Sequence, residues 1–116
     1  MPPKPQLRFR IRVLRGEMIA VGPGKIELLE AIVATGSITS AAKAMGMSYR
    51  RGWLLVDEMN RAFRSPVVDA VKGGREGGRS RLTATGEEVI RLYRAIEKTS
   101  AAAARRDIAA LVKLVR

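Results

Sequence analysis

The chain has 116 residues, enough for one domain with a modest core, and 47% of them are hydrophobic while 4% are aromatic. Its 22 Lys and Arg residues outnumber 11 Asp and Glu residues, and the net charge of +11 favours nucleic acid as the partner, ahead of a membrane surface. The sequence has no Cys and no His, which excludes disulfides, a thiolate nucleophile, an imidazole base and an ordinary zinc site. We therefore expect no metal and no cofactor.

The sequence predicts neither secretion nor insertion into a membrane. No apolar run is long enough to span a bilayer, and the start Met-Pro-Pro-Lys-Pro lacks the hydrophobic core of a signal peptide. We expect a cytoplasmic protein with no membrane partner, and a loose arm over residues 1–6.

The segment 7–13 alternates between two kinds of residue. Its apolar members are Leu7, Phe9, Ile11 and Val13, and the residues between them are Arg8, Arg10 and Arg12. A period of two predicts a strand with an apolar face and an arginine face. The arginines either touch phosphate or form a solvated face, and we favour the solvated face. A returning strand over 18–21 would complete a hairpin that extends a small sheet or pairs across a dimer.

A helix is predicted to follow from Pro23, which suits a first helical position, to Gly36, which suits a helix end. Its apolar residues recur at helical spacing and are Ile26, Leu29, Ile32 and Val33. We interpret this helix as core scaffold.

The segment 36–60 predicts two short helices joined by a tight turn. Ser37 and Ser48 can cap them, and Gly46 permits the positive φ that turns the chain between them. Ala41 and Ala42 are small enough for a close helix crossing. This is the pattern of a helix-turn-helix.

The second helix of this unit has two predicted faces. The inward stripe consists of Leu55, Val56, Met59 and Phe63, and the outward residues are Tyr49, Arg50, Arg51 and Leu54. Trp53 lies between the faces, and packing in the core and facing a groove are both open. Gly52 is unfavourable within a helix, and close approach of the preceding helix is its simplest explanation.

After this helix, residues 66–71 predict a strand with Val67 and Val71 as core candidates. The stretch 72–82 holds four glycines and four basic residues against one acid, which is typical of a hairpin tip that approaches phosphate or the minor groove. The alternative is a solvent-exposed loop without function. We favour a DNA-contacting wing.

The last segment, 83–116, predicts either one long helix or two with a joint near Thr99. Thr83 or Thr85 can cap its start, where Glu87 and Glu88 suit the helix dipole. Its apolar stripes consist of Val89, Leu92, Tyr93, Ile96, Ile108, Leu111, Val112 and Val115. A partner helix in a homodimer would bury these stripes, and packing against the same domain is the alternative.

Four motifs together resemble a known family. They are residues 36–53, 57–60, 72–78 and 82–86, within a resemblance that runs from about 22 to 96. They resemble the amino-terminal winged-helix domain of ModE-like molybdate-responsive transcription regulators and, more distantly, LysR-type DNA-binding domains. The resemblance implies a dimer that binds operator DNA, with the helix from Ser48 in the major groove. The molybdate-binding region would begin where this chain ends, so we do not expect the chain to bind molybdate.

The predicted fold is mainly α with a small β wing, and its winged helix-turn-helix domain spans 7–82, before dimerisation helices at 83–116. The predicted phosphate contacts are Lys43, Lys72, Arg75, Arg79 and Arg81, joined by the hydroxyls of Ser37, Thr39 and Ser40. Tyr49, Arg50 and Arg51 are predicted to enter the major groove, and Ser48, which caps their helix, is also a predicted DNA-binding residue.

Three other functions would share parts of this pattern. A sequence-neutral nucleoid or RNA-binding protein would carry the same charge, and an adaptor could use the wing and last helix for protein contacts. An enzyme is the least favoured, because no convergent acid, base and nucleophile are visible.

Overall fold

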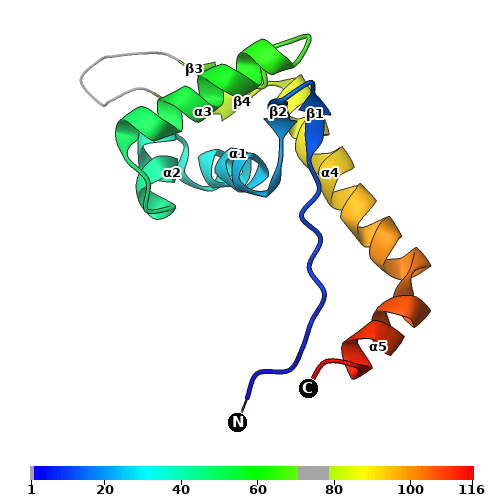
Figure 1. The fold of residues 1–116 in the computed structure, drawn as a ribbon. Helices are drawn as coiled ribbons and strands as arrows, with labels where there is room; N and C mark the ends of the chain where they lie inside the picture. The colour runs from blue at the N-terminus through cyan, green and yellow to red at the C-terminus, as the bar shows by residue number, and fades with distance from the viewer. Residues whose placement is uncertain (1, 71–78) are drawn as a thin grey trace.

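The computed structural model describes residues 2–70 and 79–116. Its helices are α1 (Pro23–Thr35), α2 (Ile38–Ala44), α3 (Tyr49–Ala62), α4 (Ala84–Ala103) and α5 (Arg105–Lys113). Its strands are β1 (Val13–Arg15), β2 (Met18–Val21), β3 (Val68–Ala70) and β4 (Ser80–Leu82). The strands form two antiparallel pairs, β1–β2 and β3–β4. Helices α1 to α3 and the β3–β4 pair form a head, and α4 leads away from it to α5 (Figure 1). The prediction of a mainly α fold with a small β component is confirmed.

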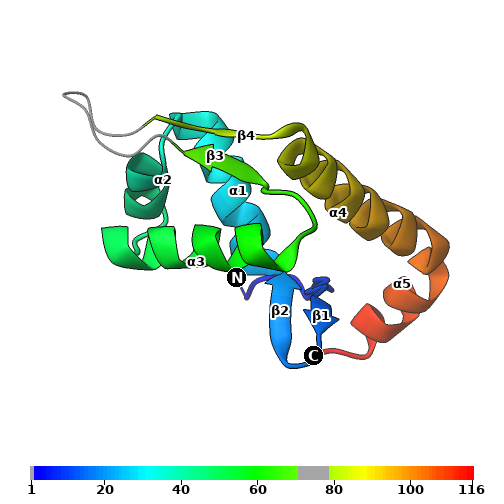
Figure 2. The same ribbon diagram turned by 90° about the horizontal axis from the view of Figure 1, so that it is seen from above.

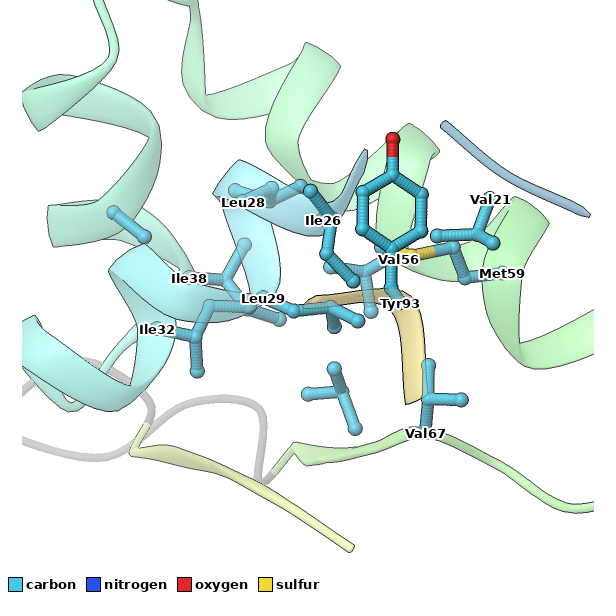
Figure 3. Packing of buried hydrophobic residues seen from close by; sticks show 12 residues of the cluster. Val21, Ile26, Leu28, Leu29, Ile32, Ile38, Val56, Met59, Val67 and Tyr93 are labelled. Atoms are coloured by element: carbon cyan, nitrogen blue, oxygen red, sulfur yellow. The ribbon is translucent and has the colours of Figure 1, made fainter. Parts of the chain in front are cut away.

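The head is organised around α1, which the other helices and β3–β4 surround. Ile26, Leu28, Leu29 and Ile32 of α1 are fully buried among side chains from α2, α3 and α4 (Figure 3). The prediction that Val33 shares this stripe is wrong, since Val33 is 62% exposed. Leu28 takes a core position because α1 is covered on more than one side.

The amino-terminal segment differs from its prediction. Only Val13–Arg15 forms a strand, and residues 7–12 run as coil between the head and α4 (Figure 1). The alternation survives in burial only over 8–12, where Phe9 and Ile11 are half-buried and the arginines are exposed, whereas Leu7 and Val13 are exposed. The predicted strand over 7–13 is wrong, since these apolar side chains pack against helices. The Tyr93 hydroxyl of α4 donates a 2.8 Å hydrogen bond to the Ile11 carbonyl, and burial raises the pKa of Tyr93.

The helix-turn-helix forms as predicted. The Ser37 hydroxyl accepts from the Ser40 amide at 3.0 Å, and the Ser48 hydroxyl accepts from the Arg51 amide at 3.1 Å. Gly46 has a φ of 70° in the turn. A Cβ added at Gly52 would lie 2.8 Å from the Ala42 Cβ, so α2 and α3 cross too closely for any larger residue.

Asn60 connects α3 to the segment that enters β3. Its carbonyl oxygen accepts from the amides of Val67 at 2.8 Å and Val68 at 3.1 Å, and its side-chain amide donates to the Val68 carbonyl at 3.1 Å. The amide side chain therefore substitutes for a neighbouring strand. Val67 is buried as predicted, whereas Val71 lies outside the described residues.

The start of α4 is joined to the same segment. Thr83 is its cap, because its hydroxyl accepts from the Gly86 amide at 3.1 Å and donates to the Pro66 carbonyl at 2.6 Å. A Cβ added at Gly86 would lie 2.1 Å from the Val67 carbonyl oxygen, so only glycine fits. The carboxy-terminal segment is two helices, and their joint lies at Ala104 rather than near Thr99.

Two ion pairs tie the elements around α1 together. Arg94 of α4 binds Glu30 of α1, with an Nε–Oε2 distance of 3.0 Å, and binds Glu97 at 2.7 Å. These hydrogen bonds raise the pKa of Arg94 and keep it charged. The buried Lys25 ammonium donates to the Ile19 carbonyl at 2.6 Å and lies 3.1 Å from Glu58 Oε2. Lys25 therefore links β2, α1 and α3.

We expect Gly52→Ala to destabilise the fold by about 1–3 kcal/mol, because the new methyl group forces α2 away from α3. Gly24→Ala is the matched control, since a Cβ there meets nothing within 4 Å and alanine favours a helix. Chemical denaturation measures both. The double variant Gly52→Ala/Ala42→Gly should lose less unfolding free energy than the two single variants lose in sum, because removal of the Ala42 methyl group makes room for the new one. If the two losses simply add, the close crossing of α2 and α3 is contradicted.

We expect Asn60→Ala to cost about 2–4 kcal/mol, because it leaves strand-entry amides without an acceptor. Asp57→Ala, which breaks only an exposed ion pair with Arg61 on the same helix, should change the unfolding free energy little. Equal effects of the two substitutions in denaturation curves would show that the Asn60 bonds contribute no special stability.

Candidate nucleic-acid interface

The first turn of α3 presents basic and aromatic side chains to solvent. Tyr49, Arg50 and Arg51 are all exposed, and so is Leu54 one turn later. The Tyr49 ring lies 6.1 Å from the half-buried Trp53 ring, at an interplanar angle of 59°. Trp53 packs against the core, which is one of the two alternatives left open by the sequence, and its ring contacts Tyr49.

The predicted residues of α2 lie close to this turn along the chain and in space. Thr39, Ser40 and Lys43 are exposed, and Ser37 is half-buried at the helix start. The Ser37 and Ser48 oxygens already accept hydrogen bonds from their own helices, which leaves their hydroxyl hydrogens as possible donors to phosphate.

The base of the β3–β4 hairpin lies beside the helix-turn-helix (Figure 2). The Ser80 amide donates a 3.0 Å hydrogen bond to the Gly36 carbonyl, which joins β4 to the end of α1. Arg79 and Arg81 are exposed on the carboxy-terminal side of the hairpin, and Arg81 is opposite Asp69 in the strand register. Lys72 and Arg75 of the predicted site lie outside the described residues.

A hollow of about 1050 Å³ separates α3 from the hairpin and the start of α4. Arg50, Trp53 and Asp57 are among the residues that line it from α3, and Asp69 and Thr85 are among those on the opposite wall. Helix and hairpin therefore enclose a concave surface that begins at the exposed first turn of α3.

Within the described residues, the basic side chains of α2 and of the first turn of α3 form no ion pair. Among residues 2–70 and 79–116, the ion pairs link Lys25 with Glu58, Arg61 with Asp57, Arg91 with Glu88, and Arg94 with Glu30 and Glu97. None of these pairs uses Lys43, Arg50 or Arg51. The acids of α3, Asp57 and Glu58, lie beyond its first two turns. The charge arrangement suits a polyanion at the amino-terminal end of α3.

The predicted dimer residues fall into two groups. Leu92, Ile96, Leu111 and Val115 are exposed, and Ile108 and Val112 are half-buried. Val89 packs against the core of its own domain, and Tyr93 is 4% exposed within that core. Assigning Tyr93 to a surface stripe is therefore corrected, because its ring fills the space between α1 and α3. Leu114, which the prediction omitted, is 83% exposed.

No helix within the described parts of the chain is long and apolar enough to cross a membrane. The same residues contain no group of three or more acidic side chains that could hold a metal ion.

Comparison with known proteins assigns the chain to a family. The sequence model of "Bacterial regulatory helix-turn-helix protein, lysR family" matches residues 24–87, which hold α1 to α3 and the start of α4. The chain belongs to this family. The crystal structure of VV2_1132, a LysR family transcriptional regulator, superposes with a TM-score of 0.51 at 14% identity, over 68% of this chain and 26% of that one. The predicted winged helix-turn-helix fold is confirmed.

The predicted resemblance to ModE-like regulators is also confirmed. The chain is 44% identical over 78 residues to the molybdenum transport protein ModE of Azotobacter vinelandii, covering 67% of this chain and 29% of that protein. It is 46% identical to the molybdenum-pterin-binding protein MopB of Rhodobacter capsulatus, over 66% and 28%. It is 39% identical to the DNA-binding transcriptional dual regulator ModE of Escherichia coli K12, over 61% and 27%. The chain spans less than a third of the length of these relatives.

Proposed function

We propose that this LysR-family protein binds double-stranded DNA at specific sequences and regulates transcription as a homodimer. The observation that carries the proposal is the exposed, unneutralised basic first turn of α3 beside the base of the wing hairpin. Membership of a regulatory helix-turn-helix family and likeness to a named DNA-binding regulator support it. In this proposal residues 7–82 form the DNA-binding domain and residues 83–116 the dimerisation helices.

Affinity would come mainly from phosphate contacts. Lys43 and the wing arginines Arg79 and Arg81 neutralise phosphates, and the released counterions make binding weaken steeply with salt. Lys72 and Arg75 are proposed to add to this from residues outside the described part of the chain. The hydroxyls of Thr39 and Ser40 donate to the backbone and set the register of α3.

Sequence preference would come from the first turn of α3. Arg50 points away from the core and can present its two-pronged guanidinium to the O6 and N7 acceptors of guanine in the major groove. Tyr49, held by Trp53, is placed to contact a neighbouring base or sugar. Arg51 lies toward the opposite flank of the helix.

The dimer would bury the exposed apolar residues of α4 and α5. A nine-residue helix such as α5 is marginal alone, and every residue of α5 is at least partly exposed in a single chain. A second copy would cover both helices in a symmetric interface. Two recognition helices would then lie about 34 Å apart and select a near-palindromic site.

The rival functions predict different behaviour. A sequence-neutral nucleic-acid binder would bind scrambled duplexes as tightly as the selected site, and an adaptor would bind no DNA even in dilute salt. The family is one of regulators, and an enzymatic role has no supporting constellation among the described side chains.

We expect Arg50→Ala to weaken binding to the preferred site by about 1–3 kcal/mol and to reduce its preference over scrambled DNA, because a base contact is lost. Arg79→Ala should weaken binding to both duplexes about equally, because it removes a phosphate contact. Fluorescence anisotropy with a site selected from a random library by the wild-type protein measures both. Unchanged affinity in both variants would reject this assignment of surfaces. Adding molybdate should leave the wild-type curve unchanged.

We expect Leu111→Glu to convert a dimer to monomers, because a charge would be buried in the apolar interface. Val33→Glu is the control, since Val33 is exposed on α1 and is not among the proposed interface residues. Sedimentation velocity separates the outcomes. A monomeric wild-type protein, or a Leu111→Glu protein that still dimerises, would contradict the proposed interface.

A further inference from the structure

The arginines of the amino-terminal segment contribute to a second hollow beside α3. This hollow has a volume of about 570 Å³, and its charged lining consists of Arg10, Arg12, Glu17, Lys25, Arg51 and Glu58. Its lining includes residues of the β1–β2 hairpin, whereas the lining of the first hollow includes residues of β3. Figure 2 shows that these two strand pairs lie on opposite flanks of α3. Basic residues therefore occur on both flanks of the proposed recognition helix.

Two contacts place the arginines of the segment in this hollow. The hydrogen bond from the Tyr93 hydroxyl holds the Ile11 carbonyl, and the half-buried Ile11 side chain packs against the core. Arg10 and Arg12, on either side of Ile11, remain exposed. The aliphatic part of Arg12 passes close to Gly22, where an added Cβ would lie 3.3 Å from Arg12 Cγ. Arg12 is thus directed along the start of α1.

The charge balance of the hollow is positive. Glu58 is paired with the buried Lys25 at 3.1 Å, so these two residues neutralise each other. Arg10, Arg12 and Arg51 then face the single carboxylate of Glu17. No ion pair found among residues 2–70 and 79–116 uses any of the three arginines. Three arginines that line one hollow are suited to phosphate, because the guanidinium group binds phosphate oxygens with paired hydrogen bonds.

We infer that Arg10, Arg12 and Arg51 bind the backbone phosphates of the DNA strand that lies across the major groove from the wing. The major groove is about 12 Å wide and is bordered by two phosphate backbones, so a helix inside it has one strand on each flank. The wing contacts the phosphates of one of these DNA strands. The hollow contacts the other strand, because its lining includes Met47, just before α3, and Arg51, in the first turn of α3 that is proposed to enter the groove. This inference rests on the proposed DNA binding. It assigns a phosphate contact to Arg10 and Arg12, for which the sequence analysis favoured a role as part of a solvated face.

The test compares Arg10→Gln/Arg12→Gln with the wild-type protein. The control is Arg61→Gln/Arg64→Gln, which removes the same charge from exposed positions near the carboxyl end of α3, outside both hollows and outside the proposed dimerisation helices. A third variant, Arg10→Lys/Arg12→Lys, keeps the charge. The probe is a fluorescent duplex that carries the site selected by the wild-type protein, and affinity is measured over a series of potassium chloride concentrations.

The glutamine variant should lower the slope of log affinity against log salt by about 1.8, or 0.9 for each lost phosphate contact. Its loss of affinity should therefore be about tenfold larger at 50 mM than at 200 mM salt, while the lysine variant and the control keep the wild-type slope. A glutamine variant with the wild-type slope, or one equally weakened at every salt concentration, overturns the inference. If the wild-type protein binds no duplex, the proposed function fails as well.

Ethylation interference on the same duplex locates the contact. In the glutamine variant, interference should disappear at phosphates of one strand, and Arg79→Ala should remove it at phosphates of the other strand. Loss on the same strand in both variants would overturn the placement of the two flanks while leaving DNA binding intact.

Discussion

The close crossing of α2 and α3 is the constraint on which the rest of the head depends. At Gly52 the two helices approach so closely that the Ala42 methyl group fills the space a side chain would need. This contact fixes α3 at one distance and angle from α2, so the residues before Gly52 project beyond α2. The same crossing buries Ile38 and Val56 against α1. A shift of α2 would therefore disturb both the core and the position of the exposed arginines.

A second set of contacts fixes the β3–β4 hairpin relative to α3. Asn60 holds the entry to β3, Thr83 holds Pro66 from the other side, and Gly86 admits the Val67 carbonyl against α4. The hydrogen bond from Ser80 to Gly36 then attaches β4 to α1. As a result, the base of the hairpin has a fixed relation to the recognition helix. A protein that reads DNA with both elements requires this relation, since an error of a few ångströms at a phosphate or base removes the hydrogen bond.

Sequence patterns predicted the parts of the fold that depend on interactions between neighbouring residues, such as helix caps and turns. Ser37, Ser48 and Gly46 act within a few residues of their position, so the two helices and their turn could be read directly. Gly52 was also readable, because glycine within a helix has few explanations. The prediction for segment 7–13 was wrong because alternating residues indicate an apolar side and a polar side. They do not show whether a neighbouring strand or a helix packs against the apolar side. Tyr93 was misplaced for a related reason, since a stripe on a helix does not distinguish its own core from a partner.

The contacts between different elements that sequence reasoning missed join residues distant along the chain. Lys25 with Glu58, Arg94 with Glu30, and Tyr93 with Ile11 depend on packing that no local pattern encodes. The site residues themselves were chosen by residue type and helix position, and their roles remain predictions. Arg51 was grouped with Arg50 because the two are adjacent, yet on the helix they project to different flanks and line different hollows.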